Sequence, residues 1–169
     1  MRQDTDLLGS MQIEDDIYYG IQTKRSLYLG DISYSKLNLY PEVIKTVAQI
    51  KKSCALANEE IGALSKEIAD AIVKACDEVI SGQFIDQFAV DMYSGGGAIA
   101  INMNLNEVIA NRANEILTGH KGYDRVHPNT HVNMCQSTND TIPSAMKIVV
   151  YRQTCLLYTS PSPRDRTRS

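Results

Sequence analysis

The feature that most constrains this chain is the spacing of its apolar residues, which recur at steps of three and four. This is the spacing of one face of an α-helix, and such a face must pack against other elements. The first block predicts a helix over residues 41–61, with Pro41 in the first turn, where a missing N–H costs nothing. Its predicted apolar face consists of Val43, Val47, Ile50, Cys54, Ala57 and Ile61.

Three further blocks with the same spacing predict three more helices. The second runs from Ser65, a suitable N-cap, to Ile80, and Gly82 follows it. The third begins between residues 104 and 106 and ends at Gly119, and the fourth begins within residues 137–140. The predicted faces contain Ile68, Ile72, Ala75, Cys76 and Val79, then Val108, Ile109, Ala113, Ile116 and Leu117, then Ala145, Ile148 and Val149.

The segment before Pro41 has a different character. Gly9, Gly20 and Gly30 divide it into short stretches, such as the one around Tyr18 and Ile21, that favour turns and short strands. No internal repeat is visible. The sequence therefore predicts a mainly α fold with a short, irregular β and turn lead before the helices.

Charge and hydropathy exclude two classes of function. The chain has 169 residues and a net charge of -3, whereas phosphate recognition needs a clustered positive excess, so nucleic acid is not an expected partner. Apolar runs such as residues 148–151 are far shorter than the roughly 20 residues of a membrane span, and the N-terminus lacks the apolar region of a secretory signal. No membrane partner and a cytoplasmic location are expected.

The last sixteen residues, 154–169, form a segment of different composition. Beyond Tyr158 they hold prolines, serines and three arginines with almost no apolar side chain, so they cannot contribute to a core. A basic interaction arm is one interpretation. From Leu156 onward the sequence also resembles the translation of a sequencing-library adapter joined to a reading frame, so we leave this tail out of functional reasoning.

Two polar or glycine-rich stretches precede predicted helices. In the first, three glycines at 95–97 leave the backbone open to close approach, although a turn explains them as well, and neither a phosphate loop nor a dinucleotide fingerprint follows. The second is Cys-Gln-Ser-Thr-Asn-Asp-Thr at 135–141. It supplies more donors than one helix cap uses, at a helix end that favours an anion such as a carboxylate. An elaborate capping cluster is the alternative.

Other chemically active side chains give weaker signals. His127 and His131 are four residues apart, but Pro128 between them excludes a common helical face and no third ligand is near, so no metal site is expected. His120 has no defined partner that would make it a base. Cys54, Cys76, Cys135 and Cys155 are widely spaced and are expected to be reduced thiols, and the acidic residues 14–16 are expected to form a solvated turn.

Several motifs in a fixed order make the chain resemble the aspartase/fumarase superfamily and, within it, the aspartases. The resemblance covers residues 4–153. The motifs are Asp-Leu-Leu-Gly at 6–9, Tyr-Tyr-Gly-Ile-Gln-Thr at 18–23, Asp-Gln-Phe-Ala-Val-Asp at 86–91, Asn-Met-Asn-Leu-Asn-Glu-Val-Ile-Ala-Asn at 102–111, His-Pro-Asn at 127–129, His-Val-Asn at 131–133 and Cys-Gln-Ser-Thr-Asn-Asp at 135–140.

The resemblance implies the reversible elimination of ammonia from L-aspartate to give fumarate, with no cofactor. It carries Ser137 and Thr138 over as contacts of the β-carboxylate, Asn139 as an amino-group or substrate contact, and Asn102 as a further substrate contact. This role agrees with the anion-site interpretation of the polar run. His127 and Asn129 match a second anion site found in fumarases.

The sequence departs from the family pattern at two places. Relatives carry Gly-Thr-Ser or Gly-Thr-Gln where this chain has Ala98, Ile99 and Ala100, so Ile99 stands at the position of a threonine that contacts substrate. A lost polar partner of this kind costs on the order of 1–3 kcal/mol. Thr130 also stands where relatives often carry an aspartate.

The family comparison also predicts how the chain is divided. We expect an N-terminal lyase domain over 1–139, the start of a truncated central helical bundle over 140–153 and a non-native tail over 154–169. The family's catalytic base lies on a downstream loop, and family members are homotetramers, so the chain alone is expected to be inactive. The alternatives are another superfamily lyase, namely a fumarase or a divergent amino-acid lyase, and a non-catalytic helical assembly module.

Overall fold

A computed structural model describes residues 1–30, 32–93 and 98–159 of the chain. The predictions made for the three glycines at 95–97 and for most of the tail, residues 160–169, lie outside the described residues. Within the described part, no helix is long and apolar enough to cross a membrane.

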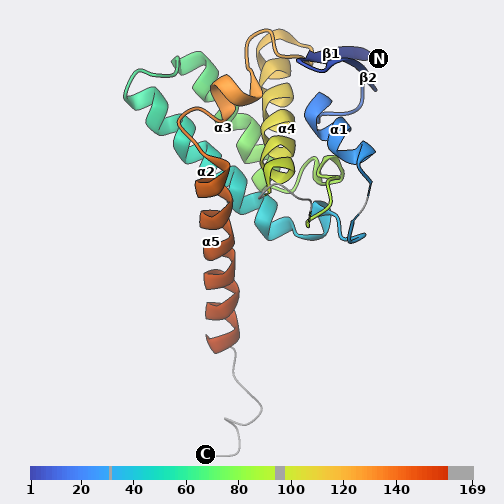
Figure 1. The fold of residues 1–169 in the computed structure, drawn as a ribbon. Coiled ribbons are helices and arrows are strands. Elements are labelled where there is room, and N and C mark those ends of the chain that lie inside the picture. The colour runs from blue at the N-terminus through green and yellow to red at the C-terminus, as the bar shows by residue number, and fades with distance from the viewer. Residues whose placement is uncertain (31, 94–97, 160–169) are drawn as a thin grey trace, which may run out of the picture.

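Four helices form the body of the protein and confirm the mainly α prediction. They are α2 (Pro41–Glu60), α3 (Lys66–Ile80), α4 (Ile99–Thr118) and α5 (Thr138–Thr159). Helix α4 stands in the middle, with α3 and α1 packed against it, while α2 crosses beside α3 and α5 (Figure 1). The core lies between these helices, and its fully buried members include Ile44, Val47, Ile72, Val79, Phe88, Leu105 and Ile109.

Helix α4 is unusual because its buried surface is rich in asparagine. Asn104 Nδ2 donates to the carbonyl of Gln87 at 3.0 Å, and Asn111 Nδ2 donates to the carbonyl of Tyr18 at 2.9 Å. Asn114 Oδ1 accepts from the backbone N–H of Arg125 at 2.9 Å. A buried amide is tolerated only when it is hydrogen-bonded, so these side chains attach irregular segments of the chain to the central helix.

The N-terminal lead contains a hairpin and a helix. Strands β1 (Arg2–Asp6) and β2 (Gly9–Ile13) pair in antiparallel register through a turn at residues 7–8, and Gly9, directly after this turn, has a φ of 113° that suits glycine. The expectation of short strands is confirmed there. It is wrong for the stretch after Gly20, which forms helix α1 (Ile21–Tyr28).

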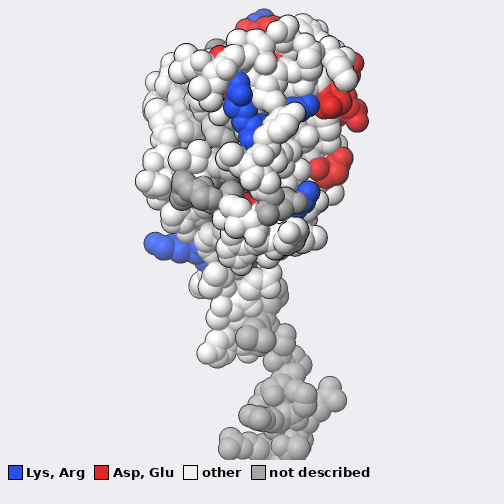
Figure 2. Space-filling model, turned by 45° about the vertical axis from the view of Figure 1, so that its right-hand side comes forward, with Lys and Arg blue, Asp and Glu red and all other residues white. Residues whose placement is uncertain are grey.

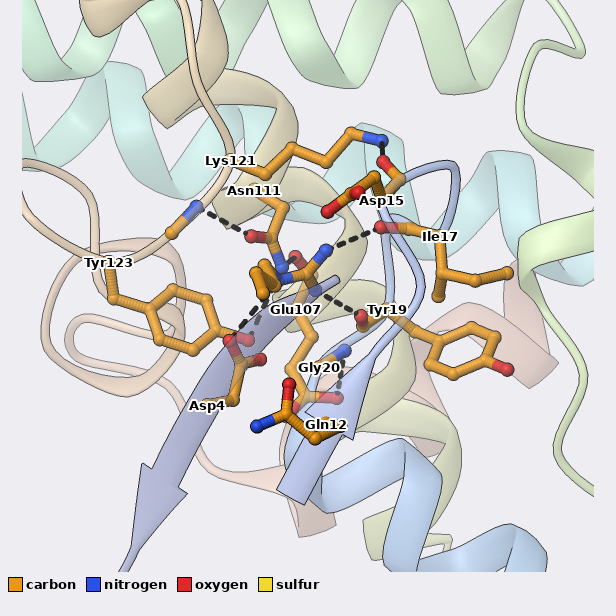
Figure 3. A network of polar contacts seen from close by, with 12 residues as sticks. Asp4, Gln12, Asp15, Ile17, Tyr19, Gly20, Glu107, Asn111, Lys121 and Tyr123 are labelled. Atoms are coloured by element: carbon orange, nitrogen blue, oxygen red, sulfur yellow. Dashed lines mark hydrogen bonds and ion pairs between the residues drawn. The ribbon is translucent and has the colours of Figure 1, made fainter. Parts of the chain in front are cut away.

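Helix α1 forms because a distant carboxylate holds its first turn. Glu107, buried on α4, accepts hydrogen bonds from the backbone N–H groups of Gly20, Gln22 and Thr23 at 2.8–3.0 Å. Figure 3 shows the bond from Gly20. These N–H groups have no partner inside a helix, and a negative charge at this end is favourable. Burial raises the pKa of the Glu107 carboxyl, and the hydrogen bonds from the α1 segment oppose that shift.

Short elements connect the helices. They are the 3-10 turns η1 (Leu37–Leu39) and η2 (Ile85–Gln87) and the single π-helical turn η3 (Pro128–Val132). In η3, His127 is the N-cap and His131 lies within the turn. Pro128 occupies the first position of the turn, where its missing N–H is not needed.

One predicted helix start needs correction. Helix α4 begins at Ile99, not between residues 104 and 106, because Ala98 adopts a left-handed conformation (φ 67°) that starts the helix, and the asparagines at 104 and 106 lie inside it. Ser65 is the N-cap of α3, yet its side chain makes no capping bond. Helix α5 continues to Thr159, into the segment 154–169 that we expect to be a non-native tail.

Helix α5 leaves the body of the protein and extends away from it (Figure 1). Ile142 and Ala145 in its first turns are buried, whereas Val150, Tyr151 and Tyr158 further along are exposed. The protruding part is mostly free of charged residues in the view of Figure 2. Ile148, predicted to lie on the packed face, is at the limit of exposure, with 36% of its surface accessible.

Candidate functional site

The polar run predicted as a site lies at the beginning of α5, next to the first turn of α4. Asn102 Nδ2 donates to Thr138 Oγ1 at 3.0 Å, and only 2% of the Asn102 surface is exposed. The fold thus brings together two of the four predicted substrate contacts, from positions 36 residues apart. Thr138 is half-buried, so its hydroxyl lies at the boundary between the core and solvent.

Ser137 and Asn139 occupy different positions in the same turn. Ser137 Oγ accepts from the backbone N–H of Asn139 at 3.3 Å, and the Ser137 carbonyl accepts from the N–H groups of Asp140 and Thr141. Ser137 therefore serves as the N-cap, as the capping interpretation required. Its hydroxyl proton and the exposed side chain of Asn139 are not used in any hydrogen bond among the described residues, so both groups are available to a ligand.

Beneath this turn lies a buried lysine that sequence reasoning missed. Lys51, on α2, has 0% of its surface exposed, and its ammonium donates to Asn102 Oδ1 at 2.9 Å. It also donates to Asn133 Oδ1 and Gln136 Oε1, each at 3.3 Å. Among the described residues, no carboxylate forms an ion pair with it. A buried positive charge held only by neutral amides is rare, because burial without a counter-charge is costly.

Burial sets the protonation of this region. It lowers the pKa of Lys51 to about 8, and it raises the pKa of Cys76, on the adjacent α3, to about 12. The pKa of Cys54 is raised by burial as well. The Cys76 thiol is therefore neutral over the range in which Lys51 titrates, and burial shifts the pKa of Cys54 in the same direction.

The buried face of α2 differs from the predicted one in its second half. Ala57 and Ile61 are exposed, and Lys51 and Asn58 are buried in their place. These two polar residues are seven positions apart and in register with Ile44, so helical spacing alone could have identified them. What obscured them was residue type, since lysine and asparagine are seldom fully buried.

The loop before α5 completes the network through two further side chains that the sequence did not single out. Asn133 Oδ1 accepts from Asn102 Nδ2 at 3.1 Å and from Asn106 Nδ2 at 3.3 Å. Gln136 Nε2 donates to the carbonyl of Val132 at 2.9 Å. These bonds fix the loop on α4, so the hydroxyl groups at the start of α5 are held in a preorganised position.

Ile99, the position of the expected threonine, does not join this network. It is the first residue of α4, its side chain is 54% exposed, and it faces a cavity of about 840 Å³ between α4 and α1. That cavity is mainly apolar, with Leu8, Leu27, Leu29, Ile32 and Met103 among the lining residues.

His127 and Asn129, the predicted second anion site, lie in the turn η3. His127 Nδ1 accepts from the N–H groups of Asn129 and Thr130, each at 3.2 Å, and burial lowers the pKa of this histidine. Both residues border a cavity of about 600 Å³ whose described lining contains Asp6 and Glu107 but neither lysine nor arginine. Burial and the two bonds that Nδ1 accepts favour a neutral, structural histidine, and the acidic lining does not favour a bound anion.

The remaining candidate groups have structural partners. His131 Nδ1 accepts from the backbone N–H of His127 at 2.9 Å, and His120 is paired with Asp124 at the surface. Within the described ranges, no cluster of three potential ligands could hold a metal ion. Residues 14–16 form an exposed turn in which Glu14 pairs with Lys24, as predicted. All four cysteines are thiols.

The fold is that of the N-terminal region of fumarate lyases. A fumarate lyase:delta crystallin structure from Brucella melitensis matches 90% of this chain and 34% of that chain, with 42% identity and a TM-score of 0.86. A class II fumarase structure from Schistosoma mansoni matches 90% of this chain and 32% of that one, with 36% identity and a TM-score of 0.85. The polar start of α5 and the asparagine-rich α4 therefore belong to a helical lyase fold.

The family is established by sequence. The family model described as lyase matches residues 9–159, and the chain belongs to this lyase family. The aspartate ammonia-lyase of Helicobacter pylori (strain J99) is 49% identical over 154 residues, which is 90% of this chain and 33% of that protein. The chain spans about a third of the length of the curated relatives it matches.

Proposed function

We propose that the chain is the N-terminal part of an ammonia-lyase that converts L-aspartate reversibly to fumarate and ammonia. The observation that carries the proposal is the Asn102–Thr138 pair at the start of α5, set on a buried cationic network. The similarity to an aspartate ammonia-lyase at 49% identity supports the choice of substrate. A dicarboxylate is the natural ligand of hydroxyl donors at a helix N-terminus.

The reaction begins with removal of a proton from Cβ of aspartate, next to the β-carboxylate. The electron pair of that C–H bond moves into the carboxylate, which becomes an enediolate with an additional negative charge. The pair then returns to form the Cα–Cβ double bond, and the C–N bond breaks to release ammonia. Donors preorganised around the carboxylate stabilise this intermediate more than the substrate, and they supply the largest part of the rate enhancement.

In this proposal the chain supplies the donors. The hydroxyl groups of Ser137 and Thr138 bind the β-carboxylate, Asn139 contacts the amino group, and Asn102 holds Thr138 in place. The base that removes the proton is assigned to a part of the enzyme other than these residues. The isolated chain is therefore expected to bind a dicarboxylate weakly and to produce no fumarate.

Further predictions concern the whole protein. We infer a division into a lyase domain over 1–139 and the beginning of a central helical bundle from residue 140, with assembly as a homotetramer in the cytoplasm. The exposed apolar residues of α5, including Val150 and Tyr151, support an assembly role for this helix. A non-native tail over 154–169 remains part of this interpretation.

The test is an assay of the complete open reading frame that contains this sequence. With L-aspartate as substrate we expect fumarate, detected by its ultraviolet absorbance, and no fumarate from L-malate. Thr138→Val should raise KM and lower kcat/KM by about tenfold or more, since it removes one donor to a carboxylate. Lys147→Ala, an exposed change further along α5, serves as the control. Fumarate from malate alone would identify a fumarase and refute the proposal.

A second candidate follows from Ile99. Its exposed alkyl side chain, beside an apolar cavity, replaces a hydroxyl at the start of α4. This favours a divergent lyase whose amino-substituted succinate carries an apolar group. Comparing kcat/KM for L-aspartate and for 3-methylaspartate in the wild type and in Ile99→Thr tests it, and a higher value for aspartate in both proteins would exclude this candidate.

A further inference from the structure

Lys51 is the charged member of the network beneath the site, and the proposed chemistry gives it no role. It is fully buried, it lies on α2, and all three of its hydrogen-bond acceptors are neutral amide oxygens. Removing a charge from water costs several kcal/mol unless it is compensated. If this position served stability alone, an apolar side chain would avoid the cost of a buried charge. The charge therefore indicates a different role.

The ammonium group determines the direction of every hydrogen bond around it. An ammonium only donates, so Asn102 must turn its Oδ1 toward Lys51 and its Nδ2 away from it. Nδ2 in turn only donates, and it meets Thr138 Oγ1 at 3.0 Å. Thr138 Oγ1 therefore accepts this bond, and its own hydrogen stays available for a group outside the network.

The loop on the other side of the ammonium is oriented in the same way. Asn133 Oδ1 accepts from Lys51, which leaves Asn133 Nδ2 to donate to the carbonyl of Gln136 at 3.0 Å. Gln136 Oε1 also accepts from Lys51, which leaves its Nε2 to donate to Val132. Without the ammonium, Asn102 Oδ1 would lose its donor, and the bond from Asn102 Nδ2 to Asn133 Oδ1 at 3.1 Å would be the main contact opposing a turned amide, in which Thr138 donates to Oδ1 and loses its free proton.

We propose that Lys51 is a positioning residue for the carboxylate site: acting through Asn102, it makes the Thr138 hydroxyl a hydrogen-bond donor to a bound dicarboxylate and places an uncompensated positive charge behind it. The inference rests on the proposed function, because it takes the start of α5 as the carboxylate site. It adds a residue that touches no substrate and that controls both the polarity and the charge of the site.

The groups around Lys51 allow the charge of its ammonium to be titrated in a binding experiment. Burial lowers the pKa of Lys51 to about 8, and the titratable groups that act on it are the Cys54 and Cys76 thiols, whose pKa values are both raised by burial. Asp140, at the start of α5, acts on Cys54. Loss of the Lys51 proton should therefore weaken dicarboxylate binding above about pH 8, and by linkage a bound dianion should raise the pKa of Lys51.

The experiment uses the protein encoded by the complete open reading frame and succinate, an unreactive dicarboxylate, as the probe. Calorimetry gives the succinate Kd from about pH 6.5 to about pH 9.5. For Lys51→Met we expect a Kd about tenfold higher at neutral pH and little pH dependence, with KM raised more than kcat is lowered. Lys52→Met, which changes the neighbouring half-exposed lysine paired with Asp77, should leave the Kd within about twofold of wild type.

A second measurement needs no change in the protein. In the wild type labelled with 13Cε-lysine, succinate should raise the pKa of Lys51, while the Lys52 resonance stays unchanged. Two results would refute the role of Lys51 but not the proposed site. One is weaker binding in Thr138→Val together with an unaltered succinate Kd in Lys51→Met. The other is an unaltered pKa of Lys51 when the protein is saturated with succinate. Unaltered binding in Thr138→Val would refute the proposed site itself and, with it, this role.

Discussion

Gly20 lies very close to Tyr123 and Glu107, so a substitution there tests how the N-terminal lead is attached to the helical body. Gly20 precedes α1 with an extended backbone (φ -115°, ψ -160°) that any residue can adopt, so alanine is disfavoured there by space alone. A Cβ at this position would lie 1.8 Å from Tyr123 Oη and 2.8 Å from Glu107 Oε1. Gly20→Ala must therefore displace a buried tyrosine, a buried carboxylate or α1 itself.

The magnitude follows from these contacts. Overpacking of a buried site costs about 1–3 kcal/mol. Displacing the Gly20 N–H from Glu107, a charge-assisted bond of 2.9 Å, adds about 1.5–3 kcal/mol if the bond is lost. Alanine restricts the unfolded chain and returns about 0.4–1 kcal/mol. We expect a net loss of about 2–5 kcal/mol in the free energy of unfolding.

The assay is equilibrium urea unfolding of the chain followed by circular dichroism, with Tyr123→Phe as the second change. Phenylalanine removes the atom that the new methyl group meets, and Asn111 keeps its bond to the carbonyl of Tyr18. The double variant should therefore be more stable than the sum of the single effects predicts, by about 1 kcal/mol or more.

Gly62→Ala provides the matched control. Gly62 has a φ of 74°, and no atom lies within 4 Å of the position that an added methyl group would take, so alanine there is strained but meets no neighbour. In the double variant, the loss of stability from Gly62→Ala should be additive with the loss from Tyr123→Phe. A loss below about 0.5 kcal/mol in Gly20→Ala, or the same coupling with Tyr123→Phe at both glycines, would refute the steric explanation.

Three more predictions concern the same chain. The pKa of Lys51 is about 8 in the folded state and 10.5 in the unfolded reference, so the folded state binds fewer protons between these pH values. The free energy of unfolding, measured in urea, should therefore rise with pH across this window by up to about 3 kcal/mol relative to Lys51→Met. The same pH dependence of stability in both proteins would contradict this. Burial raises the pKa of Cys76 to about 12, so Ellman's reagent should modify exposed Cys135 in the native protein and Cys76 only after unfolding. Arg112→Lys should cost about 1–2 kcal/mol in the same unfolding assay, because it breaks the bidentate pair with Glu78, and an unchanged midpoint would refute that value.

The sequence predicted the helices well where one face is apolar and the ends carry local signals. Pro41 and Gly119 mark real helix ends, and the face of α3 is buried as expected. Helix α1 could not be predicted in this way, because the acceptor for its first N–H groups is Glu107, more than 80 residues away. The start of α4 was missed for a related reason, since asparagines that normally mark helix ends are buried inside it.

The candidate site was predicted from the residues that match the family motifs, and the buried lysine beneath them was missed. Thr138 and Asn102 were identified through residue type and family resemblance, and the structure joins them by a hydrogen bond. Lys51, Asn133 and Gln136 remained hidden, because buried polar groups are recognisable only once their partners are known. The periodicity of apolar residues indicates which face of a helix is buried. It carries no signal for a hydrogen bond between Lys51 on α2 and a loop about 80 residues later in the sequence.

The carboxylate of Glu107 has a consequence for how the protein opens. The amides of Gly20, Gln22 and Thr23 all end on this one group, whereas the next amide along α1, that of Lys24, donates to the carbonyl of Gly20. Withdrawal of a single side chain thus releases three backbone protons together. In hydrogen exchange these three amides should share one protection factor, which reports the detachment of the lead from α4 separately from the unfolding of the helical core.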